Sequence, residues 1–202
     1  MKKSHIGILL IIIGISIMGS AIFMRYNGYI EQKKIIEEFE KTIIDLNKEQ
    51  PLNSYNNEQK KNSSNSTSTS SEIKNAIGIM KIPKIDLKVA ISEGVDVNTL
   101  KYAVGHFTGT PYPGEKGNSA IAGHRSYTYN EYFNRLDEVI EGDQIIIKTK
   151  KGEFTYKVYE KFVVLPEEVS VLNNTKDAEL TLITCTPIRV ATHRLIIKAK
   201  IK

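Results

Sequence analysis

The sequence predicts a mostly β domain, a barrel or sandwich of about 125 residues, behind an N-terminal membrane segment. Two observations lead to this expectation. From Ile77 onward, short runs of strand-like composition recur at near-regular spacing, with turn residues between them. Before Ile77, a long apolar run and then a polar stretch separate this domain from the N-terminus.

The composition suits one domain with appendages. The chain has 202 residues, 41% hydrophobic and 25% charged, with a formal net charge of +5, and single domains usually hold about 100–150 residues. Lysines are scattered among glutamates and form no arginine-rich face, so we expect no nucleic-acid partner. A mildly basic surface suits an anionic membrane or cell wall instead.

The N-terminus reads as a membrane anchor. Residues 6–23 carry no charge; about 18 apolar residues can span a bilayer, whereas the core of a signal peptide usually has about 7–15. We expect an uncleaved single-pass anchor over residues 6–24. Lys2 and Lys3 then favour residues 1–5 in the cytoplasm and the rest outside the cell. A signal peptide cleaved near residues 18–21 is the alternative.

Two segments precede the domain. Residues 25–50 are expected to form an amphipathic helical stalk, because apolar residues recur at spacings of three and four at Ile36, Phe39, Ile43 and Leu46. Residues 51–75 are almost entirely polar and are expected to form a disordered linker. The domain itself is placed at residues 76–202.

Within the domain, the elements are expected in a fixed order. Strands are expected at residues 77–82, 87–91, 119–122, 144–149, 153–159, 162–165, 181–184 and 193–197. A helical turn is expected at 98–104, a short helix at 129–136, and loops at 105–118 and 166–177.

The single cysteine lies at the end of one expected strand. Cys185 follows residues 181–184, and Pro187 stops the strand because proline has no N–H to donate. If the next run pairs with it as an antiparallel hairpin, Arg194 can face Cys185 while His193 points to the other face. A lone cysteine with histidine elsewhere is a candidate nucleophile, and an inert buried cysteine is the alternative.

The histidines leave the choice of a base open. His5 lies beside the membrane segment, and spacing alone does not distinguish His106 from His124. No CxxC, HxxxH or HExxH pattern is present, so we expect no metal centre or other cofactor.

Two separated motifs resemble the sortases, cysteine transpeptidases of Gram-positive cell envelopes. They are residues 181–185, Thr-Leu-Ile-Thr-Cys, with Arg194 nine residues later, and residues 117–125, Gly-Asn-Ser-Ala-Ile-Ala-Gly-His-Arg. The likeness covers about residues 76–202. It implies a closed β-barrel of about eight strands with short helices. It also implies Cys185 as nucleophile, His124 as general acid and base, and Arg194 as stabiliser of substrate or oxyanion.

The resemblance further implies the reaction. Such an enzyme cleaves a sorting signal like Leu-Pro-x-Thr-Gly between Thr and Gly, holds the Thr carbonyl as a thioester, and passes it to an amine of the peptidoglycan precursor. The partners implied are that amine, secreted proteins with the C-terminal signal, and the membrane. Calcium modulation is not indicated by any ligand spacing.

The subclass and the substrate contacts are inferred from residues outside the two motifs. Residues 51–75 contain no Asp-Pro and the chain has no second apolar helix after the domain, which favours class D over class C, with class A as another alternative. Loop 166–177, with Pro166 and Val171, and the neighbours Thr184 and Thr186 of the cysteine are expected to contact the sorting signal. The alternatives to a transpeptidase are a cysteine hydrolase of wall peptides and a non-catalytic tethered binding domain.

Overall fold

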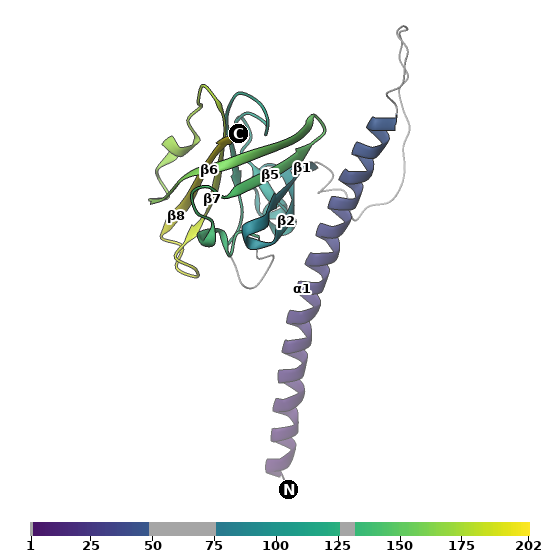
Figure 1. Ribbon diagram of the computed structural model, residues 1–202. Coiled ribbons are helices and arrows are strands. Elements are labelled where there is room, and N and C mark those ends of the chain that lie inside the picture. The colour runs from purple at the N-terminus through teal and green to yellow at the C-terminus, as the bar shows by residue number, and fades with distance from the viewer. Residues whose placement is uncertain (1, 49–75, 126–131) are drawn as a thin grey trace.

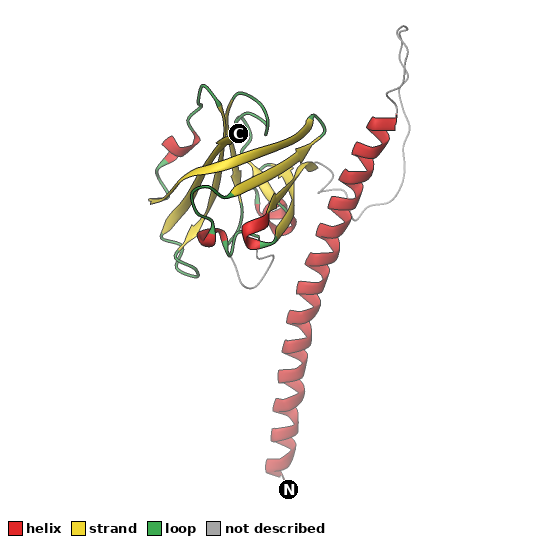
Figure 2. Ribbon diagram, in the orientation of Figure 1, coloured by secondary structure: helices red, strands yellow, loops and turns green. Residues whose placement is uncertain are grey.

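A computed structural model of the protein describes residues 2–48, 76–125 and 132–202. It consists of one long N-terminal helix, α1 (Lys2–Lys48), beside a β-barrel (Figures 1 and 2). The N-terminal half of α1 extends past the barrel, and the C-terminal half runs alongside it (Figure 1). The linker predicted at residues 51–75 lies outside the described residues.

The barrel is closed by eight strands in the order β1-β2-β3-β4-β7-β8-β6-β5. Neighbouring strands are antiparallel except for the parallel pairs β2–β3 and β4–β7. The strands are β1 (Ala76–Ile82), β2 (Leu87–Glu93), β3 (Val104–His106), β4 (Gly117–Ala122), β5 (Gln144–Thr149), β6 (Gly152–Val164), β7 (Ala178–Thr186) and β8 (His193–Ile201). The short helices are α2 (Val97–Tyr102) and the 3₁₀ turns η1 (Pro83–Ile85), η2 (Leu136–Glu138) and η3 (Val169–Leu172). The predicted closed β-barrel is therefore confirmed.

The barrel interior is filled by alternate residues of the strands. On β7, Leu180 and Leu182 point inward and are fully buried in the main core. Because successive side chains of a strand point to opposite faces, Thr181, Ile183 and Cys185 point outward. The cysteine therefore lies on the outer face of the barrel, at the end of β7.

The structure differs from the sequence-based expectation at two strands. Strand β3 lies in the Gly-rich segment expected as loop, where a Cβ on Gly105 would approach Gly94 O to 2.2 Å; only glycine allows this packing of backbone on backbone. The two strands expected at 153–159 and 162–165 form the single strand β6. A register shift between Val158 and Glu160, a β-bulge, lets it continue past the polar residues that suggested a break.

The predicted helix at 129–136 is not seen in its described part. Residues 132–135 form turns, and the 3₁₀ turn η2 follows. These turns bury Phe133 and Leu136 in the barrel core, so tertiary packing overrides the local helical preference. Residues 126–131 lie outside the described part of the chain.

Helix α1 packs against the barrel. Its apolar residues Ile35, Ile36, Phe39 and Ile43 are 4–9% exposed and contact β1, β2 and the end of α2. Lys88 on β2 donates to Glu40 at 2.8 Å. The amphipathic pattern predicted at Ile36, Phe39 and Ile43 is thus the docking face of α1, whereas Leu46 is 45% exposed.

Shortening Phe39 should loosen this contact. We expect Phe39→Ala, in the full chain held in detergent micelles, to weaken docking of α1 by about 3 kcal/mol, a typical loss for a buried Phe. Hydrogen exchange should then rise for amides 35–46 and stay unchanged in β7 and β8. Ile44→Ala, at a position 51% exposed, is the control. Equal exchange in the two variants would contradict the docking.

Candidate active site

The hairpin of β7 and β8 brings the cysteine opposite the arginine. Their antiparallel register pairs Cys185 with Arg194 and Thr186 with His193. Directly opposite residues of an antiparallel pair share a face of the sheet. The predicted facing of Cys185 and Arg194 is therefore confirmed, and His193 belongs to the other face.

Parallel pairing of β4 with β7 brings in His124. This register pairs Ala122 with Ile183, and continuing it by two residues places His124 beside Cys185. Two hydrogen bonds hold this continuation: Gly123 N donates to Ile183 O at 3.1 Å, and Thr184 Oγ1 donates to Gly123 O at 2.7 Å. His124 is exposed, and Cys185 and Arg194 are half-buried. The three residues thus lie at the ends of three adjacent strands.

Tight packing behind Gly123 fixes the backbone of His124. A Cβ on Gly123 would lie 2.6 Å from Cδ2 of Phe133, whose ring is fully buried. Phe133 N also donates to His124 O at 3.3 Å. The neighbouring Tyr132 donates to Tyr102 O at 2.9 Å; burial raises the pKa of Tyr132 far above its usual range, so this phenol keeps its proton.

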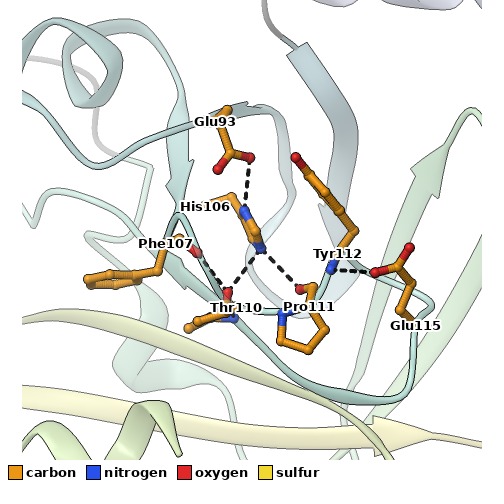
Figure 3. A network of polar contacts seen from close by, with 8 residues as sticks. Glu93, His106, Phe107, Thr110, Pro111, Tyr112 and Glu115 are labelled. Atoms are coloured by element: carbon orange, nitrogen blue, oxygen red, sulfur yellow. Dashed lines mark hydrogen bonds and ion pairs between the residues drawn. The ribbon is translucent and has the colours of Figure 1, made fainter. Parts of the chain in front are cut away.

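His106 has a different setting. Its side chain is 1% exposed; Nδ1 lies 3.0 Å from Glu93 Oε2, and Nε2 lies 3.0 Å from both Pro111 O and Thr110 Oγ1 (Figure 3). It is stacked on Tyr112. Its strand, β3, pairs with β2 and β4 but not with β7. His106 therefore ties loop 107–116 to the barrel, and of the two histidines only His124 lies beside the cysteine.

The guanidinium of Arg194 is oriented by backbone carbonyls. Its Nη1 donates to His193 O at 3.0 Å and to Ala191 O at 3.2 Å. These bonds hold a permanently charged group with five N–H donors at the edge of the β7–β8 loop, on the same face as Cys185. The arrangement can present N–H donors to an oxygen that becomes negative near the sulfur.

The two threonines beside Cys185 form hydrogen bonds to the segment that contains His124. Thr184 is 2% exposed and donates to Gly123 O, as described above. Thr186 Oγ1 accepts from Nη1 of Arg125 at 2.9 Å. The Arg125 side chain is only 5% exposed and pairs with Asp137 at 2.9 Å. Sequence reasoning assigned no role to Arg125, whose only signal was its place directly after His124.

An apolar surface on the outer face leads to the cysteine. Strand registers place Phe162 beside Ile196 and Ile196 beside Ile183, and the next row is Val164, Arg194 and Cys185. On this surface lies η3 of the β6–β7 loop, whose Val171 is 8% exposed and packs on Ala120, Ile183 and Ile196. Pro166, from the same loop, is exposed.

Comparisons with known proteins agree with this geometry. The family model described as Sortase domain matches residues 80–202. Sortase D of Bacillus subtilis is 36% identical over 124 residues, 61% of each chain. Sortase A of Listeria monocytogenes is 29% identical over 207 residues, 97% of this chain and 90% of the relative.

Solved structures give the same result. A Clostridium perfringens Sortase D5 transpeptidase is 34% identical, with a TM-score of 0.66 over 85% of this chain and 98% of the other. The family model alone covers more than half of the chain and includes the strands that carry His124, Cys185 and Arg194. The chain belongs to the sortase family.

Proposed function

We propose that this sortase is a membrane-anchored cysteine transpeptidase of class D. It cleaves a Leu-Pro-x-Thr-Gly-like sorting signal between Thr and Gly and transfers the protein to an amine of the peptidoglycan precursor. The proposal rests mainly on one observation: His124, Cys185 and Arg194 lie together at the ends of the adjacent strands β4, β7 and β8. Likeness to sortases of class D, from two organisms, supports the subclass.

The first half of the reaction forms an acyl-enzyme. The thiolate of Cys185 attacks the carbonyl carbon of the signal's Thr, because the thiolate and not the thiol is the nucleophile. Negative charge develops on the carbonyl oxygen, where Arg194 donates hydrogen bonds. The C–N bond to Gly then breaks, and protonated His124 gives its proton to the leaving amine. A thioester on Cys185 remains.

The second half transfers the acyl group. The acceptor amine attacks the thioester carbon, and neutral His124 takes the proton that the amine loses. Arg194 again stabilises the oxyanion, and the thiolate of Cys185 leaves. A new amide bond replaces the thioester, and the enzyme returns to its starting state. Water in place of the amine would give the free acid.

The apolar residues beside Cys185 fit an aliphatic part of the signal. Val171, Ile183 and Ile196 form a buried cluster, and the half-buried Phe162 and Val164 pack against it; aliphatic side chains bind to such partly exposed residues through burial of apolar area. Val171, which is 8% exposed, and Pro166, which is exposed, both stay predicted substrate contacts. Thr184 and Thr186, whose hydroxyls bond to Gly123 and Arg125, are assigned to positioning instead.

Membrane anchoring is proposed through α1. This helix is long and apolar enough to cross a membrane. We infer a single crossing by residues 6–24, with residues 1–5 in the cytoplasm and the barrel outside. The exposed Tyr26 and Tyr29 follow the apolar run, at the depth where tyrosines favour the membrane–water interface. Docking of Ile35 and Phe39 then holds the barrel close above the membrane.

A peptide assay tests the proposal. The full chain in detergent micelles is incubated with fluorogenic Leu-Pro-x-Thr-Gly variants, with and without an amine acceptor, and products are identified by mass spectrometry. We expect an amide-linked product with the amine and slower formation of the acid without it. Acid alone under both conditions indicates a hydrolase. No cleavage, with Cys185 resistant to alkylation, indicates a binding domain.

A further inference from the structure

One buried amide connects the β6–β7 loop to the two strands that lead to His124 and Cys185. Asn118, on β4, is fully buried. Its Nδ2 donates to Val171 O at 2.9 Å and to Asn173 O at 3.1 Å, and its Oδ1 accepts from Thr181 Oγ1 at 2.7 Å. Both amide hydrogens and the amide oxygen of this side chain are therefore bonded.

We propose that Asn118 is a positioning residue that sets substrate selectivity by fixing η3 and the β6–β7 loop on the outer face of the barrel, beside the row that holds Cys185. The inference deepens the proposed function and rests on it. Asn118 does not touch the reacting atoms in this assignment. It acts through the backbone of the loop, whose Val171 side chain packs in one cluster with Ile183, two residues before Cys185 on the same face of β7.

The bonds of Asn118 join three parts of the fold. Its own strand, β4, leads to His124, and Thr181 lies on β7, four residues before Cys185. The two carbonyls come from the loop that crosses the outer face between β6 and β7. A movement of this loop relative to the two strands would break at least one of these bonds. The loop is thus held in register with the strands that carry the candidate acid–base and nucleophile.

A second contact from the loop reinforces the first. Oδ1 of Asn174 accepts from the backbone N of Asn118 at 3.1 Å. It fits there because residue 117 is glycine: a Cβ on Gly117 would lie 2.1 Å from that oxygen. Asn118 therefore contacts the loop through both its backbone N–H and its side-chain amide.

The chemistry of an amide matches this position closely. Two carbonyl oxygens converge on Nδ2, and both can only accept hydrogen bonds. A carboxylate of the same shape has no hydrogen to donate and would repel both carbonyls. Asn118→Asp is therefore a nearly isosteric change that reverses the interaction with the loop while keeping an acceptor for Thr181.

The test compares Asn118→Asp with two loop variants in the full chain in detergent. Asn174→Ala removes the second contact, together with the bond that Thr175 N donates to the same oxygen, and leaves the buried amide intact. Asn173→Ala is the matched control, because its backbone carbonyl, not its side chain, receives the Asn118 bond. Three quantities are measured: hydrogen exchange of amides 169–174, the alkylation rate of Cys185, and kcat and KM for peptides whose Leu is kept or replaced by Ala.

For Asn118→Asp we expect faster exchange at 169–174 and a KM about 10-fold higher for the Leu peptide, as the loss of two hydrogen bonds suggests. Preference for Leu over Ala should fall by a similar factor, while kcat and Cys185 alkylation change little. Asn174→Ala should shift the same quantities less, and Asn173→Ala should leave them unchanged.

Each other outcome overturns the proposal. Unchanged exchange at 169–174 in Asn118→Asp would refute the positioning role, whether or not any peptide is cleaved. Faster exchange with unchanged preference would refute the link to selectivity. A parallel loss of kcat, alkylation and thermal stability in both Asn118→Asp and Asn174→Ala would indicate a general structural role. Failure of the proposed function appears separately, as absence of cleavage by the unaltered protein.

Discussion

Replacing Cys185 by alanine should abolish both cleavage of the sorting peptide and transfer to an amine. We expect turnover to fall by about 10⁴–10⁶-fold, the loss typical when a catalytic nucleophile is removed. Cys185 is the only cysteine in the chain, so no second thiol can form the thioester. The measurement is product formation over long incubations, together with mass spectrometry for an acyl-enzyme in the unaltered protein.

The fold should survive this change. Cys185 is half-buried on the outer face of β7, outside the barrel core, so alanine there removes little packing and the unfolding midpoint should stay nearly constant. Cys185→Ser is a second variant of almost the same shape, and it should be inactive because a hydroxyl is a far weaker nucleophile than a thiolate at neutral pH. Cleavage at normal rates by either variant would rule out the thioester mechanism.

Replacing Arg194 by alanine should slow the reaction strongly without preventing it. We expect kcat to fall by about 10²–10³-fold, as when one oxyanion donor is removed from other acyl-transfer enzymes. KM should change less, because the charge on the oxygen develops mainly in the transition state. The rate of acyl-enzyme formation, measured in a single turnover, should fall by the same factor as kcat.

Two further variants test whether the effect depends on the guanidinium of Arg194 itself or only on its positive charge. Arg194→Lys should recover only part of the rate, since an ammonium lacks the planar set of donors that here also bonds to His193 O and Ala191 O. Lys200→Ala, an exposed cation at the other end of the same strand, should leave kcat unchanged. Similar rates for Arg194→Ala and Lys200→Ala would show that only overall charge matters.

Local sequence signals were sufficient for most of the fold. The run at 181–184 is β-branched and apolar, Pro187 follows it closely, and a second such run begins at His193, so an antiparallel hairpin was the simplest outcome. That hairpin already sets Cys185 opposite Arg194. The amphipathic spacing of Ile36, Phe39 and Ile43 likewise marked the apolar face of α1 correctly.

Local signals failed where long-range packing overrides them. The segment 105–118 is rich in Gly and Pro, yet β3 extends into it as far as His106, because Gly105 lets the chain approach Gly94 closely. The break expected between 159 and 162 is absent: Glu160 and Lys161 pair with β8, and a bulge between Val158 and Glu160 keeps both halves in one ladder. The expected helix ending at Leu136 gives way, in its described part, to turns that bury Phe133.

By itself, the sequence determined a β-rich domain behind an apolar N-terminal segment, with one thiol facing one arginine across a hairpin. Residue spacing left the histidine open and only the resemblance implied His124; the tertiary structure decided which histidine lies beside the cysteine, what covers Ile183 and Ile196, and where α1 docks. These features depend on contacts between residues far apart in the chain: the parallel pairing of β4 with β7, and the bonds of Asn118 to Val171 and Asn173. Composition and periodicity show which face of a helix or strand is apolar. They do not show what packs on that face, because this depends on which distant strands the closed barrel brings together.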